Sequence, residues 1–256
     1  MRGLGVLLGK EFTEILRTWR LYVVPGILIF FGISSPILAE LTPQLLSSMS
    51  GLAEQGVVIE IPPATTVDAY LQFNKNAMQI ALIAVIIATA GAIAGERTSG
   101  TAQIVLAKPV SRTAMVLAKA LSNWGLILVA VAVAALLCAG VTALIFDTEL
   151  LPEFAGVVGL WYVLAMFLVA LTLFFSAALG SNAGAAGAGI AVYFLLTIGS
   201  LWEAAREFTP IGLLGAGDRI IMGATDIPVV WPVITGVAGA FALVGLAAVA
   251  FGRKEL

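Results

Sequence analysis

The sequence predicts an all-α membrane protein with six transmembrane helices, an N-terminal amphipathic interfacial helix and a cytoplasmic helix-turn-helix between spans two and three. Three observations predict this fold: the apolar composition, the spacing of the charged residues and the uneven distribution of Lys and Arg. The hydrophobic fraction is 61%, the charged fraction is 11% and the mean hydropathy is +1.07. A soluble domain has about 45–50% apolar and about 25% charged residues. One aqueous core cannot bury so much apolar surface, so we expect the chain to fold in lipid.

The uncharged intervals between charged residues give the number of spans, because a transmembrane helix needs about 20 apolar residues. The interval between Glu153 and Glu203 encloses 49 residues. As one helix it would measure roughly 74 Å, more than twice the ~30 Å hydrocarbon thickness. It is therefore expected to form two spans, with a turn at Gly180–Gly184. The predicted spans of the single domain 1–256 are 21–39, 76–95, 120–146, 154–179, 184–202 and 227–252.

The distribution of basic residues predicts the orientation of these spans. An even number of spans places both termini on one side of the membrane. Segments 1–20, 96–119 and 253–256, which then share that side, hold 10 of the 13 Lys and Arg residues. Eleven of the fifteen acidic residues lie in the loops of the opposite side. Because basic residues accumulate in cytoplasmic segments, both termini and segment 96–119 are expected in the cytoplasm.

Segment 1–20 has the pattern of an amphipathic helix. Its apolar residues fall at helical three-and-four spacing, and they are Leu4, Leu8, Phe12, Ile15, Leu16 and Trp19. Lys10, Glu14 and Arg17 fall on the other face. The pattern predicts a helix lying in the cytoplasmic interface of the membrane. The alternative is a cytosolic helix packed on another subunit.

Several kinds of chemistry are absent from the sequence. No histidine occurs, which removes His-dependent nucleophilic triads and most zinc sites. The predicted spans contain no ionisable Asp, Glu, Lys or Arg, which counts against a self-powered ion-driven pump. Residues 5–10 resemble a phosphate loop, but the spacing is one residue short and Glu11 replaces the hydroxyl residue. We therefore predict no catalytic residue, no metal site and no cofactor bound by this chain.

The net charge and the cysteine content exclude a class of partner and a kind of crosslink. The net charge of −2 provides no basic excess to neutralise phosphates, which argues against a nucleic-acid partner. Cys138 is the one cysteine, so an intrachain disulfide is impossible.

The stretch GERTSGTAQIVLAKPVSRTAMVLAKAL, residues 95–121, concentrates scarce charge in one place. It carries four basic residues, Arg97, Lys108, Arg112 and Lys119. Its first part can continue the second span as a helix with a weak point at Gly100. Lys108 precedes a proline and is biased away from helical geometry, and Ser111 is the expected N-cap of the helix that leads into the third span. Apolar residues around the turn lie where lipid cannot reach, and such exposed tips usually contact a protein partner.

These residues resemble a known family. The pattern E-R-x-x-G-T at 96–101, followed by K-P-V-S-R at 108–112 and by Lys119, is similar to the cytoplasmic loop of the ABC type 2 permease family, the membrane subunits of ATP-driven exporters. The N-terminal KEFTEILRTWR with its proline-interrupted first span, and FTPIGLLGAG between spans five and six, resemble the family too. The resemblance covers essentially the whole chain.

The resemblance implies a multi-pass permease of the cell (plasma) membrane that works with a separate nucleotide-binding (ATPase) subunit. That subunit binds ATP and Mg, and two permeases, identical or homologous, assemble with two ATPases. The loop is then a coupling helix that docks on the ATPase, and 203–226 is a re-entrant helical hairpin. The residues assigned to ATPase coupling are Glu96, Arg97, Gly100, Thr101, Ile104, Leu106, Lys108, Pro109, Val110 and Arg112.

Two further sets of residues are assigned, and alternatives stay open for each group. Phe73, Asn76 and Gln79 are expected to line a cavity. Small residues allow close helix approach in lipid, so Gly180, Gly184 and Gly187 are expected either at a dimer interface or in packing within one subunit. The four basic residues of 95–121 could instead fix topology and bind lipid phosphates. The alternative to a permease subunit is a stand-alone channel or secondary carrier whose loop is regulatory.

Because the sequence offers no phosphate-binding loop, we expect the purified chain, free of any second subunit, neither to bind nor to hydrolyse ATP. Phosphate release by a clean preparation measures this. Hydrolysis that persists after every other protein has been removed would contradict the division of labour between two subunits.

Overall fold

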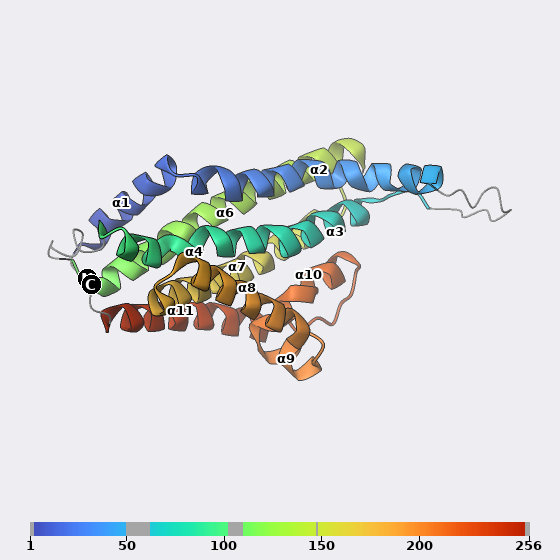
Figure 1. Cartoon of the computed structure of the whole chain (residues 1–256). Coiled ribbons are helices and arrows are strands. Elements are labelled where there is room, and N and C mark those ends of the chain that lie inside the picture. The colour runs from blue at the N-terminus through green and yellow to red at the C-terminus, as the bar shows by residue number, and fades with distance from the viewer. Residues whose placement is uncertain (1–2, 50–61, 102–109, 147, 254–256) are drawn as a thin grey trace.

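The computed structural model describes residues 3–49, 62–101, 110–146 and 148–253. Within these ranges the regular structure is helical and contains no strand. Six helical stretches are long and apolar enough to cross a membrane, and they are Arg20–Leu45, Thr66–Thr98, Arg112–Ile145, Leu151–Leu179, Asn182–Gly199 and Val230–Gly252. The prediction of an all-α protein with six spans is confirmed. Figure 1 shows the long helices running side by side in an elongated bundle.

The six membrane-spanning stretches follow one another along the bundle in alternating directions (Figure 1). The first half contains α1 (Leu4–Arg17), α2 (Arg20–Met49), α3 (Thr66–Asn76), a π-helical turn (Ala77–Ala81), α4 (Leu82–Thr98) and α6 (Arg112–Ile145). The second half contains α7 (Leu151–Leu179), α8 (Asn182–Gly199), α9 (Glu203–Phe208), a 3₁₀ turn (Pro210–Gly212), α10 (Leu213–Ile221) and α11 (Val230–Gly252). The predicted N-terminal helix is present as α1. Its place in the membrane interface stays a prediction.

The helices extend beyond the uncharged intervals that predicted them. The second span is predicted to begin at residue 76, but α3 begins ten residues earlier, at Thr66. A capping box explains the early start, because the backbone N–H and the hydroxyl of Thr65 both donate to the Asp68 carboxylate, at 2.8 Å each. These bonds satisfy groups that a helix start leaves unpaired. Charged residues therefore lie on the ends of helices rather than between them.

Helix α7 forms the centre of the bundle. It packs against α4, α6, α8, α10 and α11, and its side chains Phe154, Trp161 and Leu164 are buried. The Phe154 ring stacks on Tyr70 of α3 with centroids 4.1 Å apart. A continuous apolar core thus joins spans from both halves of the sequence.

Side chains of neighbouring helices bond backbone groups of the second span. In the π-helical turn, the carbonyl of Met78 accepts a 2.6 Å hydrogen bond from the Tyr193 hydroxyl of α8. In α4, the Ser176 hydroxyl of α7 accepts from the amides of Ile93 and Ala94, at 3.2 and 2.9 Å, and donates to the carbonyl of Ala90 at 2.6 Å. Lipid offers no such partners, so these bonds hold the second span against α7 and α8.

The segment between α8 and α11 folds back on the bundle as two short helices, α9 and α10, joined by the 3₁₀ turn. Helix α10 packs on α7 and α3. Asn74 of α3 donates to the carboxylate of Asp218 of α10 at 2.8 Å. The hairpin shape agrees with the expectation for 203–226, and its depth in the membrane stays a prediction.

The two ends of the bundle differ in charge. We call the charged end the one that carries α1, the end of α4, the start of α6, the α7–α8 turn and the end of α11 (Figure 1). The basic residues described there are Lys10, Arg17, Arg20, Arg97, Arg112, Lys119 and Arg253, against Lys75, Arg206 and Arg219 in the described part of the opposite end. Exposed aromatic residues lie near each end, Trp19 and Tyr22 at one and Trp202 and Trp231 at the other. This is the pattern of two membrane interfaces.

The asymmetry predicts that the charged end faces the cytoplasm. Two exposed positions test it in a chain whose buried Cys138 is replaced by Ala. Thr113→Cys, in the first turn of α6, should react with an impermeant thiol reagent only after cell lysis. Ala224→Cys, in the loop before α11, should react in intact cells. Labelling of Thr113→Cys from outside would reverse the orientation.

Candidate functional site

A buried ion-pair cluster joins three helices at the charged end. The ammonium group of Lys119, on α6, lies 3.0 Å from a carboxylate oxygen of Glu11 on α1 and 2.8 Å from one of Glu96 on α4. The Lys119 side chain is 0% exposed. A buried charge costs several kcal/mol unless it is paired, so Lys119 requires both carboxylates. The sequence leaves open that Lys119 binds lipid phosphates, and this fully buried position does not agree with such a contact.

Lys10 extends the cluster toward solvent. Its ammonium lies 3.0 Å from Glu11 and 2.8 Å from Glu14, and it also contacts Glu96. Burial alone lowers the pKa of Lys10, but its bonds to Glu14, Glu96 and Glu11 outweigh burial and raise that pKa above its usual value. Lys10 therefore stays charged at physiological pH, and its contribution to stability is lost only in strong alkali.

Glu14 shows the opposite shift. Burial raises the pKa of its carboxyl, but the Lys10 hydrogen bond and the charges of Lys119, Lys10 and Arg20 lower it below the ordinary 4.5. The stability that Glu14 contributes is therefore fully present above pH 4.5. It is lost as the pH falls through the lowered folded-state pKa.

The local sequence of α1 explains how a carboxylate comes to be buried. Leu7, Glu11 and Ile15 are the buried residues of α1, and residues four apart share one face of a helix. The packing of Leu7 and Ile15 against the bundle buries this face, and Glu11 is buried because it lies between them. Helix α1 packs mainly against α6, which brings Glu11 to Lys119.

Arg112 connects the start of α6 with the end of α11. One guanidinium nitrogen donates to the carbonyls of Phe251 and Gly252, at 3.2 and 2.9 Å. The guanidinium also lies 5.9 Å from the centre of the Phe251 ring. The last carbonyls of a helix lack partners and carry partial negative charge. Arg112 therefore caps α11 from another helix.

Arg97 lies across the turn between α7 and α8. Gly180 ends α7 with φ of +73°, and a Cβ atom there would lie 3.0 Å from Nη1 of Arg97. Glycine thus permits both the left-handed turn and the approach of the guanidinium. Nη1 of Arg97 and Oε2 of Glu96 are buried without a hydrogen-bond partner among the described residues.

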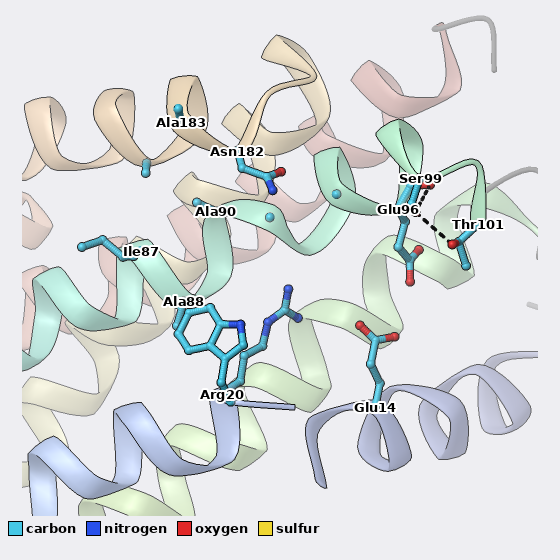
Figure 2. Close-up of a pocket in the computed structure, with 14 residues that line it drawn as sticks. Glu14, Arg20, Ile87, Ala88, Ala90, Glu96, Ser99, Thr101, Asn182 and Ala183 are labelled. Carbon is cyan, nitrogen blue, oxygen red and sulfur yellow. Dashed lines mark hydrogen bonds between the residues drawn. The ribbon is translucent and has the colours of Figure 1, made fainter. Parts of the chain in front are cut away.

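A cavity of about 620 Å³ opens beside the cluster, between α4, the start of α8 and the α1–α2 junction. Figure 2 shows Glu14 and Glu96 pointing toward each other across it, with Arg20 entering from the start of α2 and Asn182 at the start of α8. Its wall also includes Ser99, whose hydroxyl donates to the carbonyl of Glu96 at 3.3 Å. The cavity is polar near the cluster and apolar along α4.

The residues assigned to ATPase coupling fall into two groups. Glu96, Arg97, Gly100, Thr101, Val110 and Arg112 lie at the charged end, whereas Ile104, Leu106, Lys108 and Pro109 lie outside the described residues. The predicted N-cap is confirmed, because the Ser111 hydroxyl accepts from the amide of Ala114 at 3.1 Å. Gly100, the predicted weak point, has φ of +75° and lies just beyond α4. The coupling roles stay predictions.

The three residues predicted to line a cavity have different surroundings. Phe73 is buried with its ring 5.5 Å from that of Phe154. Asn76 donates to the hydroxyl of Ser35 at 3.1 Å. Gln79 is exposed and lines a 190 Å³ pocket with Tyr193 and other residues, whose wall does not include Phe73 or Asn76. Their role in a substrate path stays a prediction.

The three glycines predicted for helix packing also have different surroundings. Gly180 forms the turn described above. A Cβ atom at Gly184 would lie 2.6 Å from the hydroxyl of Ser181, which caps α8. Gly187 is exposed and faces open space. Gly187 thus leaves room for a neighbour on α8, and the choice between dimer contact and packing within one subunit stays open.

The sequence analysis missed the pairing of Glu11 with Lys119. A signal was present, because Glu11 interrupts the apolar i, i+4, i+8 series of α1 and Lys119 is flanked by apolar residues on both sides. The span prediction assumes that every charged residue lies outside the membrane helices and at the surface. A buried pair of charged residues does not fit this assumption.

Comparison with known proteins places the chain near a family of transporters. Residues 6–206 match the family model described as ABC-2 family transporter protein. The chain is also similar to the uncharacterized transmembrane protein YxlG of Bacillus subtilis (strain 168), with 22% identity over 226 residues, which cover 87% of this chain and 86% of the relative.

The cluster makes a test of stability. Lys119→Ala leaves the carboxylates of Glu11 and Glu96 buried without this ammonium, and breaking a buried pair in this way costs about 3–5 kcal/mol. We expect a clearly lower unfolding temperature in detergent, measured by circular dichroism. Lys75→Ala, at an exposed position of the opposite end, is the matched control and should unfold like wild type. Equal unfolding temperatures for both variants would contradict the structural role of Lys119.

Proposed function

Since the chain belongs to the ABC-2 family of transporter proteins, and is therefore the membrane component of an ABC transporter, we propose that it is the permease subunit of an ATP-driven exporter in the plasma membrane. In this proposal a separate nucleotide-binding subunit binds ATP and Mg and performs the hydrolysis. The permease itself is not the catalyst. It converts the movement of the ATPase into export of a substrate.

The observation that carries the proposal is the ion-pair cluster around the segment between α4 and α6. Glu96 lies in the last turn of α4, and Lys119 lies two turns into α6. Their 2.8 Å contact ties the two helices together next to the segment on which an ATPase would act. Glu11 adds α1 to the same unit. A force applied to this segment would therefore move three helices together.

Arg112 supports the same proposal. Its bonds to the carbonyls of Phe251 and Gly252 connect the start of α6 to the last span. The connection extends a movement of the segment to α11. We propose that the partner in the membrane is a second copy of this chain or a homologous permease, and that the charged end faces the cytoplasm, where ATP is available.

The stand-alone channel or secondary carrier has less support. Ion-driven carriers place ionisable groups at membrane depth. The described ion-pair cluster instead lies at one end of the bundle, on α1, the last turn of α4 and the start of α6. A buried cluster at the end of the bundle suits the joining of helices beside a partner better than ion passage.

The proposal predicts an ATPase partner that depends on the segment between α4 and α6. We expect an ABC-type ATPase to copurify with the tagged chain from its native membranes in mild detergent, identified by mass spectrometry. Leu106→Asp should abolish copurification and ATP-dependent transport, because a carboxylate in an apolar contact costs several kcal/mol.

The control for this experiment is Ala224→Asp, which adds the same charge to an exposed loop of the opposite end. It should retain the partner and the transport, and both variants should reach normal membrane levels. If Leu106→Asp keeps its ATPase and full transport, the docking role of the segment is wrong.

A further inference from the structure

We propose that the 620 Å³ cavity beside the ion-pair cluster binds the head group of an amine-bearing glycerophospholipid, of the phosphatidylethanolamine type, from the leaflet at the charged end. The proposal concerns a lipid site of the chain itself. It does not depend on the ATPase, so the failure of one proposal leaves the other intact.

The first argument is an unsatisfied acceptor on Glu96, a residue that lines the cavity. Oε2 of Glu96 is buried and has no hydrogen-bond partner among the described residues, and the Glu96 side chain is 10% exposed. A buried acceptor without a donor is costly, and native structures contain few of them. Glu14 points toward Glu96 across the opening (Figure 2). A primary ammonium, with three N–H donors, can bond both carboxylates.

The second argument is the charge of the cluster. One carboxylate oxygen each of Glu11, Glu14 and Glu96 lies within 4.8 Å of the other two. The ammonium groups of Lys10 and Lys119 pair with them. The positive charge of Arg20 also acts on Glu14, so three carboxylates face three cationic groups and the site is neutral. A head group that carries one positive and one negative charge keeps this balance, whereas a divalent metal bound alone would leave an excess of positive charge.

The third argument is a cationic side chain in the cavity wall that can bind the phosphate of the lipid head group. Arg20 lines the cavity and makes no hydrogen bond or ion pair with the described residues. It is close enough to Glu14 for its charge to lower the pKa of that carboxyl. A guanidinium binds phosphate oxygens in a bidentate manner. The cavity thus presents negative groups beside a positive one, which complements a zwitterionic head group.

The fourth argument is the apolar remainder of the wall. Ile87 lies nine residues before Glu96 on α4, which is roughly 13 Å along a helix, and it is 49% exposed. Ala90, Ala183 and Ala186 complete this side with small side chains. Polar groups at the end of the bundle and apolar ones toward its middle match the polarity of a phospholipid. Trp19, 52% exposed beside Arg20, belongs to the interface where head groups lie.

The test measures lipid binding to the purified full-length chain by native mass spectrometry. The probes are phosphatidylethanolamine and phosphatidylcholine with the same acyl chains, because the quaternary ammonium of phosphatidylcholine has no N–H donor. We expect about tenfold tighter binding of phosphatidylethanolamine, the effect of a hydrogen bond to a charged group.

Four variants separate the contributions. Glu14→Gln should remove most of the preference for phosphatidylethanolamine, while Glu149→Gln, at an exposed position of the opposite end, should keep it. Ala183→Leu, which narrows the cavity from an exposed position on α8, should weaken binding of both lipids. Ala191→Leu, exposed on the same helix and absent from the cavity wall, should bind both like wild type.

Three results would overturn the proposal. Equal affinity of the wild type for the two lipids would remove the role of the carboxylates. Wild-type binding by Ala183→Leu would place the lipid elsewhere. A disulfide between two copies of the Ala183→Cys variant, in a chain without Cys138 and without bound lipid, would show that a second copy covers the cavity.

Discussion

The structure at the charged end depends on one buried ammonium group. Lys119 is fully inaccessible, and an isolated charge at such a position would be far too costly to keep. Its two carboxylate partners come from α1 and α4, so both helices must remain in contact with α6. The position of α1 beside the bundle follows from this requirement. So does the shape of the cavity, whose wall combines residues near the α1–α2 junction with the last turns of α4.

The last turns of α4 are held from several sides. The Ser176 hydroxyl bonds three backbone groups between Ala90 and Ala94, and Glu96 pairs with Lys119 only two residues later. Helix α7 and helix α6 thus fix neighbouring turns of the same helix. Arg97 then crosses to the α7–α8 turn, where Gly180 leaves it room. Under the proposed function this is the place where force enters the membrane domain, and these contacts resist local bending there.

Features of local origin were predictable from the sequence, and features of long-range origin were not. The number of spans follows from the uncharged intervals. The N-cap at Ser111 and the turn at Gly180 follow from backbone chemistry that involves a few neighbouring residues. The pairing of Glu11 with Lys119 joins residues 108 positions apart, and no local pattern specifies which carboxylate meets which ammonium. The early start of α3 has a different cause, because the Thr65–Asp68 capping box lies before Lys75, the charge that sets the predicted start of this span.

The two ends of the bundle use polar groups in different ways, and the difference bears on function. At the opposite end, the described contact between Asn74 and Asp218 joins an amide to a carboxylate and holds the short hairpin α9–α10 on the bundle. At the charged end, ammonium and carboxylate groups are buried together, so separating the helices would expose several unpaired charges to a low dielectric. Helices joined in this way move as a unit or not at all. A transporter driven from one end requires such a unit where the force is applied, and apolar helix contacts, which lipid can replace, would not provide it. Under the proposed function, the buried charge of Lys119 serves the transmission of force as well as the stability of the bundle.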